Sequence, residues 1–461
     1  MPVNTTHPEY DKNRSAWQKC RDVIAGADSI KDAGSTYLPL LGNIAETDTR
    51  YLAYKTRAKW LGATARTIEG LEGEVFRNPP QIILPAALDP IAENFTLTGQ
   101  AFTQFTRRIL RERLIMGRVG ELVDYSEADR RTYSIIYAAE NIINWREEII
   151  AGQRRLVLVV LTESTDRAVA DVYSHQTITR YRVLQLIDGV YTVTVYEQGT
   201  EMPMSIVSGP VTPTVRGSRL DHIPFFFYGV TQNMSDIEKP PLNDLMDLNV
   251  ADYRNSADLE WGRHFCGCPF YYILGAPELS DDNASIEVGS SSAFVSQNEN
   301  AKPGIVEFTG DGLGALERAR EENAREMAMM GARIIEAQKL VGETADAIAR
   351  RQSGKLSVLQ SIVEVQDDVH EAALREHAAW MGAPTNAIEC HLNRDYLVTR
   401  LSAQDLTALV SAWQAGTLSK NSVFHNLQQG EIIPMDRTFE EEQALIEAEM
   451  PAFEPGMAAG G

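Results

Sequence analysis

Residues 240–264 read PPLNDLMDLNVADYRNSADLEWGRH, and residues 313–337 read LGALERAREENAREMAMMGARIIEA. Both runs space their apolar side chains at helical intervals, and two prolines precede the first run, as at a helix start. Residues 268–309, between them, contain short stretches typical of β-strands. We therefore predict a long helix that leaves the body, a compact β-rich insert, and a long helix that returns. Such helices need neighbours for their faces, which indicates a subunit of a ring or tube.

A third long helix is predicted over residues 344–381, after a short loop. Gly354 is its expected weak point or kink. This helix is basic at its start and acidic toward its end. The returning helix before it carries two oppositely charged pairs at i,i+4 spacing, Arg318 with Glu322 and Glu321 with Arg325, and this spacing favours ion pairs on a helix surface.

The composition indicates a folded protein with two or three domains. The chain has 461 residues, and 44% of them are hydrophobic, enough for a sizeable core. No apolar run is long enough to span a bilayer, and residues 1–10 lack the blocks of a signal peptide. Four cysteines in a chain of this size are typical of a reducing compartment.

The net charge is −21, from 43 Lys and Arg against 64 Asp and Glu. Proteins that wrap nucleic acid gain affinity by neutralising phosphates with cations. The charge therefore weighs against a tight nucleic-acid binder. It remains compatible with a channel, because repulsive walls would let nucleic acid pass without holding it.

The N-terminal half is predicted to be helical first and β-rich afterwards. Helices are expected over residues 12–34, 46–75 and 97–116. Four arginines of the last helix are interpreted as a solvated basic face: Arg107, Arg108, Arg111 and Arg113. From about residue 117, spacing of about ten residues predicts an antiparallel sheet or small sandwich. Its strands are expected over residues 118–125, 155–162, 168–173, 179–185 and 191–197, with a tight hairpin turn at Asp188-Gly189. Residues 222–228 are expected to form a buried strand or a core plug.

Two glycine-containing motifs resemble phosphate-binding loops and fail the requirements. Residues 352–357 contain Gly354-Lys355, but they lack the earlier glycine of a P-loop and the Ser or Thr directly after Lys. Residues 309–314 are glycine-rich between a strand and a helix, yet the last glycine of a dinucleotide fingerprint is missing. We interpret residues 309–314 as a flexible joint.

No metal or catalytic constellation is predicted either. Cys266, Cys268 and His264 are too few for a closed zinc site, and a thiol nucleophile would lack an orienting acid. We interpret them as packing at a helix end. Acid pairs such as Asp367-Asp368 are expected on a solvated or inter-subunit face.

Several short motifs follow one another along nearly the whole chain. They are Trp17 with Arg21-Asp22, Tyr37-Leu38-Pro39, Arg66-Thr67 with Gly73 and Phe76, residues 120–125, YAAENIINW at 137–145, Pro240-Pro241-Leu242, Gly331-Ala332-Arg333, Glu343-Thr344-Ala345, Trp413-Gln414-Ala415-Gly416 with Leu418-Ser419, and residues 427–430. In this order they resemble the portal proteins of tailed bacteriophages, in particular a phage family once catalogued only as a domain of unknown function.

The resemblance implies an α+β portal fold with a β-rich wing, long stem helices, a small β-rich clip and a long tunnel helix. Such subunits form a ring, typically of twelve copies, at one capsid vertex. The implied parts are the wing at 1–239 (helical, then β-sheet from about 117), stem helix one at 240–266, the clip at 267–312, stem helix two at 313–337, the tunnel loop at 338–343, the tunnel helix at 344–384, and a C-terminal wing with a short crown and acidic tail at 385–461.

The resemblance also implies a role and partners. The ring would nucleate procapsid assembly and let double-stranded DNA enter and later leave. Its partners would be the terminase, the major capsid and scaffold proteins, and head-completion or adaptor proteins, with no cofactor, metal or membrane. The protein would not be an enzyme, and it would be made in the host cytoplasm and end in the virion.

Two sets of residues are candidates for contacts in such a portal. The DNA-facing tunnel candidates are Lys339, Arg350, Arg351 and Lys355, which could instead pair with acids of the adjacent subunit. The clip and terminase-contact candidates are Glu287 and Glu307.

Two alternatives stay open from the sequence. One is a soluble hydrolase or nuclease whose carboxylates converge on a metal, which would run as a monomer or dimer. The other is a different head–tail connector, which would lack the helix–clip–helix insertion.

Overall fold

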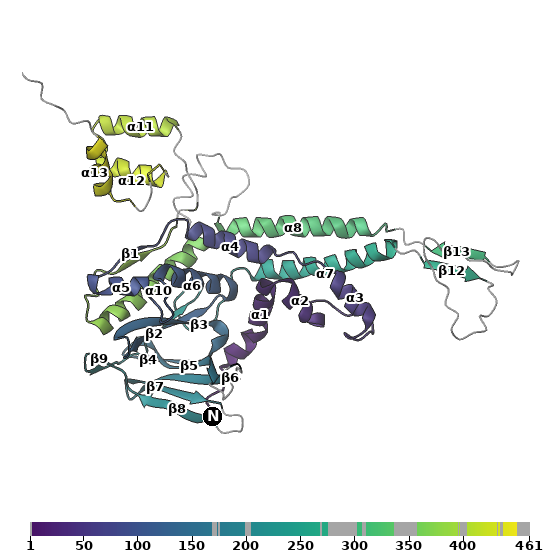
Figure 1. Ribbon diagram of the computed structural model, residues 1–461, viewed down its shortest axis with the longest axis horizontal. Coiled ribbons are helices and arrows are strands. Elements are labelled where there is room, and N and C mark those ends of the chain that lie inside the picture. The colour runs from purple at the N-terminus through teal and green to yellow at the C-terminus, as the bar shows by residue number, and fades with distance from the viewer. Residues whose placement is uncertain are drawn as a thin grey trace, which may run out of the picture.

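The protein is described here from a computed structural model, which covers residues 2–167, 173, 176–198, 204–267, 270–274, 302–306, 310–335, 357–394, 396, 403–430, 432–433 and 437–449. It is a mixed α+β protein, as the sequence predicts. Figure 1 shows a body of sheets and helices, from which the helix pair α7 (Asn243–Gly267) and α8 (Leu313–Ile335) projects. Three C-terminal helices, α11 (Ala403–Gln414), α12 (Lys420–Gln429) and α13 (Phe439–Glu449), lie beside one another apart from the body.

Shorter helices replace the long ones predicted for the N-terminal region. They are α1 (Pro8–Ala25), α2 (Ala27–Asp32), η1 (Gly34–Thr36), α3 (Thr49–Arg57), α4 (Ala63–Val75), η2 (Ala86–Leu88), α5 (Asp89–Glu93) and α6 (Phe102–Met116). The helix predicted over 12–34 is broken at Gly26, whose φ of 99° suits glycine alone. The helix predicted over 46–75 is broken at Ala58, where the backbone is extended with ψ 138°.

A five-stranded antiparallel sheet forms the lower part of the body in Figure 1. Its strands are β4 (Ile142–Ile150), β5 (Gln153–Arg167), β6 (Gln176–Ile187), β7 (Val190–Glu197) and β8 (Ser205–Val211), in that spatial order. The predicted antiparallel sheet is confirmed, and so is the hairpin turn at Asp188-Gly189. Both of its residues have positive φ, 49° and 74°, as a two-residue turn of this twist requires. Most of the strand predicted at 168–173 lies outside the described residues.

A second sheet has three strands in the order β11 (Phe225–Tyr228), β2 (Val119–Ser126) and β3 (Arg131–Ala138), with η3 (Ala139–Asn141) after β3. Of the two interpretations of residues 222–228, a buried strand or a core plug, the buried strand is confirmed for its last four residues, β11. Only glycine fits at position 120, because the ring of Phe225 occupies the space that a Cβ would need. One ring carbon lies 2.3 Å from where that Cβ would be. Two small antiparallel pairs complete the strands, β1 (Gln81–Ile83) with β14 (Glu389–His391) and β9 (Thr214–Val215) with β10 (Ser218–Arg219).

The helix predicted over 344–381 is corrected at its start. The described helix is α10 (Val358–Met381), and Ser357 before it has extended backbone with ψ 159°. Ser357 and Gln360 form a capping box, in which each side chain bonds the other's backbone N–H (2.7 and 3.1 Å). The prediction of one helix running from residue 344 through Ser357 is therefore wrong, because α10 begins after Ser357. Gly354 lies outside the described residues.

The helix α10 packs on the body through one wide buried face, while Val358, Asp368 and Arg375 stay exposed. An apolar cluster holds Val369, Leu374 and Ala378 of α10 against the aromatic side chains that precede and begin α6. Those aromatic side chains are Phe95, Phe102 and Phe105, all 2% exposed or less. Fully burying an aromatic side chain of this size contributes about 1.5–3 kcal/mol, so this cluster is a main attachment of α10 to the body.

The basic face expected on α6 holds only for Arg107 and Arg108, whose side chains are exposed. Arg111 pairs with Glu72 at 3.2 Å. Arg113 is fully buried, because position 113 falls on the face of α6 that packs into the core.

Two buried arginines near the end of α6 differ in the hydrogen bonds that their guanidinium groups make. Arg113 donates to the carbonyl of Gly229 (2.6 and 2.9 Å), to the carbonyl of Ile362 (2.7 Å) and to Gln366 Oε1 (3.1 Å). Arg118 is equally buried, but none of its nitrogen atoms has a hydrogen-bond partner among the described residues.

Aromatic rings are what Arg118 has in place of acceptors. Its guanidinium carbon lies 4.0 Å from the ring centroid of Trp145 and 4.6 Å from that of Phe227. Each such contact contributes up to about 2 kcal/mol when desolvated. Burial lowers the pKa of both Arg113 and Arg118 to about 9, so both remain cationic at neutral pH.

We predict that Arg113→Met and Arg118→Met differ in cost. Arg113→Met leaves the buried Gly229 carbonyl and the amide oxygen of Gln366 without their donor, so the free energy of unfolding should fall by about 3 kcal/mol. Arg118→Met orphans no acceptor and removes a desolvated charge, so the loss should stay below about 1 kcal/mol. Urea denaturation followed by circular dichroism measures both, and equal losses would contradict this account.

Candidate functional site on the projecting helix pair

The helices α7 and α8 run antiparallel and carry a two-stranded hairpin at their far end (Figure 1). The hairpin pairs β12 (Phe270–Leu274) with β13 (Lys302–Val306), with Phe270 opposite Val306 and Leu274 opposite Lys302. The predicted helix, β-rich insert and returning helix are thus confirmed in outline. Residues 275–301 of the expected β-rich insert lie outside the described residues.

The helix α7 is the inner member of the pair. It contacts α1, α3, α4 and α8, and its buried residues are Leu245, Met246, Asn249, Val250, Asp252, Tyr253, Ser256, Ala257 and Leu259. In the described part of α8, only Met327 is buried. The helix α8 therefore covers one side of α7 and presents a wide outer face.

Close packing fixes the two helices where they approach the hairpin. Leu313 Cδ2 lies 2.5 Å from the position that a Cβ on Gly262 would take, so Leu313 fits only against glycine. Gly310 has φ +73° and accepts a hydrogen bond from the N–H of Leu313 at 2.8 Å. The segment expected to be a flexible joint is, from residue 310 onward, a tight turn packed on α7.

Two buried polar side chains of α7, Asn249 and Ser256, are satisfied by the segment that runs from the end of α3 into the first turn of α4. Asn249 Oδ1 accepts from the Thr64 backbone (3.2 Å) and hydroxyl (3.0 Å), and its amide donates to the Leu61 carbonyl (2.6 Å). Ser256 Oγ accepts from the backbone N–H of Lys59 at 2.8 Å. These bonds set the position of α7 on the body.

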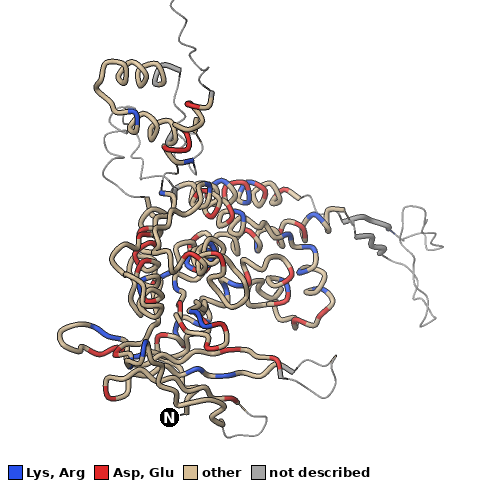
Figure 2. The backbone as a smooth tube through the Cα atoms, turned by 60° about the vertical axis from the view of Figure 1, so that its left-hand side comes forward, with Lys and Arg blue, Asp and Glu red and all other residues tan. Residues whose placement is uncertain are grey.

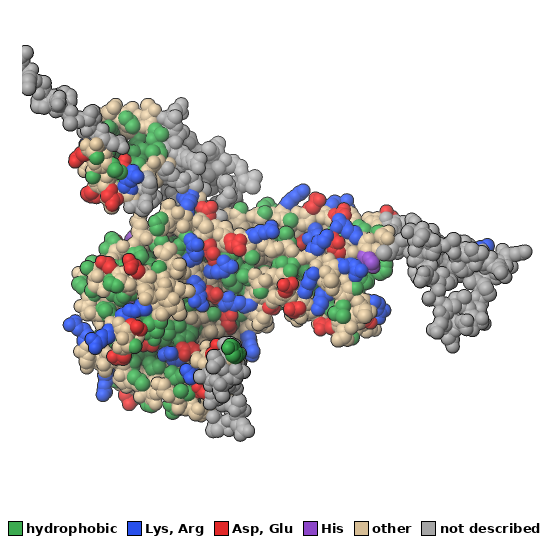
Figure 3. Space-filling model, viewed as in Figure 1, with side chains coloured by type: hydrophobic (Ala, Val, Ile, Leu, Met, Phe, Trp, Pro, Cys, Tyr) green, Lys and Arg blue, Asp and Glu red, His purple; other side chains and the backbone are tan. Residues whose placement is uncertain are grey.

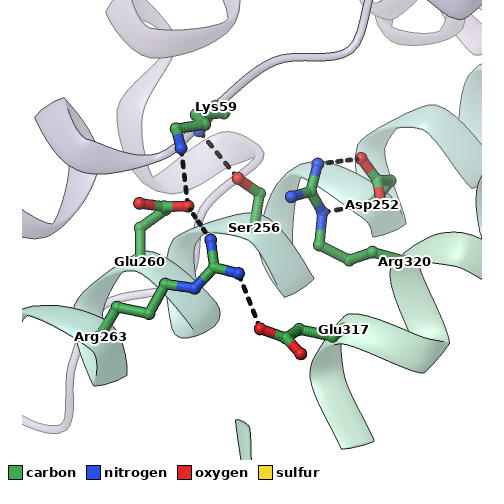
Figure 4. Close-up of polar contacts among 7 residues, drawn as sticks. All are labelled: Lys59, Asp252, Ser256, Glu260, Arg263, Glu317 and Arg320. Carbon is green, nitrogen blue, oxygen red and sulfur yellow. Dashed lines mark hydrogen bonds and ion pairs between the residues drawn. The ribbon is translucent and has the colours of Figure 1, made fainter. Parts of the chain in front are cut away.

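Ion pairs join α8 to α7 (Figure 4). Asp252, 1% exposed, accepts from Nε and an Nη of Arg320 at 3.1 and 3.2 Å. Arg263 bridges Glu260 (2.9 Å) on α7 and Glu317 (2.7 Å) on α8 at the surface. Removing one partner of a buried pair leaves an uncompensated charge, whereas exposed pairs contribute little. Asp252–Arg320 is therefore the pair that matters for the attachment.

We predict that Arg320→Met destabilises the protein by about 3 kcal/mol or more, since Asp252 would remain buried without a counter-charge. Arg263→Met is the matched control, and it should cost less than about 1 kcal/mol because its pairs are exposed. Chemical denaturation of the two variants and the wild type makes the comparison. A loss for Arg263→Met as large as that for Arg320→Met would contradict the assignment.

A buried polar network attaches α10, which follows the helix pair in sequence, to the body. Its centre is the carboxylate of Glu121 in β2, which is fully buried. In one chain of contacts Arg113 donates to Gln366 (3.1 Å), Gln366 Nε2 lies 3.2 Å from His370 Nε2, and His370 Nδ1 lies 2.9 Å from the Tyr228 hydroxyl. Tyr228 then donates to Glu121.

A second chain reaches Glu121 from its other side. The hydroxyl of Thr132 lies 2.8 Å from His377 Nδ1, and His377 Nε2 lies 2.9 Å from Ser134 Oγ. Ser134 donates to Glu121. The direction of both chains assigns one proton to Nδ1 of His370 and one to Nε2 of His377. Every link then has one donor and one acceptor.

Burial sets the protonation of this network. Burial raises the pKa of Glu121 to about 7, against the hydrogen bonds from Ser134 and Tyr228, which favour the carboxylate. Burial lowers the pKa of His370 and of His377 to about 3, with smaller effects of nearby arginines. Both imidazoles are therefore neutral at physiological pH, as the two chains require.

We predict that stability falls as pH rises through the pKa of Glu121. That pKa is higher in the folded chain, about 7, than its ordinary value of 4.5, so the stabilising contribution is full below about pH 4.5 and is lost as pH rises through about 7. The difference in unfolding free energy between wild type and Glu121→Gln should shift by roughly 2 kcal/mol from pH 5 to pH 8.

The difference between the two proteins is the quantity to measure, because it cancels other titrating groups. Asp367 and His222 also have raised pKa values, about 6 and about 9, and they act in the same direction in both proteins. A difference that stays flat with pH would show that Glu121 does not titrate in this range.

The residues nominated from the sequence are not placed by the structure. Lys339, Arg350, Arg351 and Lys355, the tunnel candidates, lie outside the described residues, and so do the clip candidates Glu287 and Glu307. The predicted pair Glu321–Arg325 is confirmed at 3.8 Å, whereas the other predicted pair, Arg318 with Glu322, is not formed among the described residues.

Asp367 corrects the expectation of a solvated or inter-subunit face. It is 2% exposed and accepts from Arg394 at 2.6 Å and from the backbone N–H of Leu392 at 3.1 Å. Its neighbour Asp368 is exposed. Asp367 thus links α10 to the segment after it. Helical periodicity in the sequence alone could not distinguish this buried role from an ion pair on the surface.

The described residues contain neither a metal-binding cluster nor a membrane-spanning helix. Among the described residues, no group of three or more His, Cys, Asp or Glu side chains is arranged to hold a metal ion. Cys266 is exposed in the last turn of α7, and Cys268 lies outside the described residues. Within the described ranges, no helix is both long enough and apolar enough to cross a bilayer.

The network around Glu121 is what the sequence analysis missed. The available signal is in α10, where Gln366, His370 and His377 fall at spacings of four and seven, on one helical face. That face is otherwise apolar, so three polar residues on it indicate a buried polar cluster. Glu121 itself stands in an apolar strand, and only the fold brings it to the histidines.

Comparisons with known proteins add three observations. A family model described as "Domain of unknown function (DUF4055)" matches residues 241–381, under a third of the chain. The match covers α7, α8, the hairpin between them and α10. No curated protein matches the chain.

Solved structures of gene transfer agent (GTA) particles give distant likenesses. A chain from the neck of an empty GTA particle, computed with C6 symmetry, has a TM-score of 0.41 at 13% identity and covers 85% of this chain and 96% of that one. A chain from the virion of a native GTA particle has a TM-score of 0.39 at 13% identity, covering 85% and 96%. A chain from the neck of a native GTA particle, computed with C12 symmetry, has a TM-score of 0.39 at 13% identity and covers 79% of this chain and 89% of that one. TM-scores below 0.5 carry no inference about this chain.

Proposed function

We propose that this protein is a portal-type subunit of the head–tail connector of a tailed bacteriophage or a related particle. The observation that carries the proposal is the projecting pair α7 and α8, with the β12–β13 hairpin at its end and α10 after it. The resemblance stated from the sequence implies this order for the stem, the clip and the tunnel helix. The match of one family model to residues 241–381 treats the same elements as a unit.

The outer surface of α8 supports assembly into a ring. A helix of 23 residues with Met327 as its one buried side chain in the described part leaves most of its surface to solvent. Figure 3 shows charges of both signs along this projecting part, without a large apolar patch. Such a surface suits contacts between subunits that are soluble before they assemble.

The proposed role is passive. Twelve subunits of −21 each would carry −252 in total, so the ring would present a predominantly acidic channel past which double-stranded DNA slides. Terminase, capsid, scaffold and head-completion proteins would be its partners, and no catalysis is proposed. Lys339, Arg350, Arg351 and Lys355 remain the proposed local contacts with DNA, and Glu287 and Glu307 those with the terminase. Assembly would occur in the host cytoplasm and the ring would remain in the virion.

The native mass of the purified chain tests the proposal. A ring of twelve subunits of 51.2 kDa has a mass of about 614 kDa, and negative-stain images should show rings with a central hole. The series should span low to high protein concentration at moderate salt. A chain that remains at 51.2 kDa throughout would contradict self-assembly, and assays for metal-dependent hydrolysis would then follow.

A further inference from the structure

One outer side of the helix pair is rich in carboxylates. Among the described side chains of α8, the exposed charged ones are Glu317, Arg318, Glu321, Glu322, Arg325 and Glu326, four acids against two bases. Glu322 and Glu326, one turn apart, have no hydrogen-bond or ion-pair partner among the described residues. Like charges at this spacing repel, so a cation from outside would stabilise them. Glu322, Glu326 and Met329, whose side chain is 52% exposed, define what we call the α8 face.

The opposite side of α7 is rich in cations. Figure 1 shows α3 across α7 from α8, and α3 packs on α7 through Tyr54, whose hydroxyl donates to Asp258 at 2.6 Å. Residues 49–59 contain four Lys and Arg and no carboxylate. Lys31 of α2 joins them, because its ammonium donates to the Thr56 carbonyl at 3.0 Å.

Three lysines and one apolar residue define the α3 face: Lys31, Lys55, Lys59 and Leu52. Lys55 makes no ion pair with a described residue, and Lys59 reaches Glu260 at 2.9 Å while 63% of its side chain stays exposed. Leu52 is 42% exposed. It gives the α3 face one exposed apolar side chain, as Met329 does on the α8 face. Figure 2 shows Lys and Arg interspersed with Asp and Glu along the described backbone.

We propose that the α8 face of one subunit binds the α3 face of a second copy of this chain. The inference rests on the proposed ring and names its contact surfaces. Because the two faces lie on opposite sides of α7, each copy uses a different surface toward each neighbour. Such a heterologous contact generates a ring when the rotation closes. Two α8 faces, each with unpaired carboxylates, repel one another, which disfavours a two-fold dimer through this surface.

The charges of this contact select the partner surface more than they add affinity. The groups are largely exposed, so each pair contributes little and is screened by salt. Complementary charge acts mainly on the rate of encounter and on the choice of partner. Assembly should therefore be most sensitive to charge reversal at low salt.

Charge reversal on each face, followed by mixing, tests the proposal. One variant carries Glu322→Lys with Glu326→Lys, and the other carries Lys31→Glu with Lys55→Glu. Each alone should raise the concentration needed for ring formation at least tenfold at low salt. A 1:1 mixture should restore rings near the wild-type concentration, because each interface then pairs opposite charges again. Glu93→Lys with Glu127→Lys, two exposed carboxylates of the body, is the matched control and should assemble as wild type does.

The outcomes separate this inference from the proposed function. If wild type and both reversed variants all form rings at equal concentration, the interface is wrong while the ring stands. If the reversed variants fail singly and remain unassembled when mixed, although circular dichroism shows both folded, the pairing of these two faces is also wrong. A wild type that stays monomeric would overturn the ring and the interface together.

Discussion

The position of α10 depends on one buried carboxylate. Glu121 accepts hydrogen bonds from Ser134 and Tyr228, and through them two histidines of α10 are held over β2, β3 and β11. A polar group buried this deeply costs free energy unless every partner is in place. A shift of α10 by one turn would break both chains of contacts at once. The network therefore selects one register among the several that an apolar helix face would tolerate.

The helix pair obeys a different constraint, which is steric. Leu313 occupies the space that a side chain at Gly262 would need, and the buried pair Asp252–Arg320 fixes the same two helices nearer the body. Between these points the surface ion pairs add little. The pair is thus held by one close contact and one buried charge pair, while its outer faces remain free to be selected for contacts with other molecules.

Much of the fold could be predicted from the sequence. The helix, insert and returning helix follow from apolar periodicity and proline placement, and the Asp188-Gly189 turn follows from the φ angles that glycine allows. Helix ends were predicted less well. Gly26 and Ala58 break helices that periodicity alone extends, and Ser357 caps α10 through a bond to Gln360 that only the backbone geometry reveals. The burial of Arg113 and Asp367 could not be predicted, because their acceptors and donors come from segments more than twenty residues away.

The pairing of β1 with β14 bears on the order in which the chain can fold. Gln81 lies opposite His391, so this pair closes a loop of about three hundred residues, and contacts of such long separation form late. The aromatic cluster of Phe95, Phe102 and Phe105 likewise cannot be covered until α10 has been synthesised. During synthesis, which proceeds from the N-terminus, the five-stranded sheet and the helix pair leave the ribosome before the residues that cover this cluster. The nascent body therefore carries an uncovered aromatic surface until α10 is synthesised, and the time spent in that state sets its exposure to aggregation.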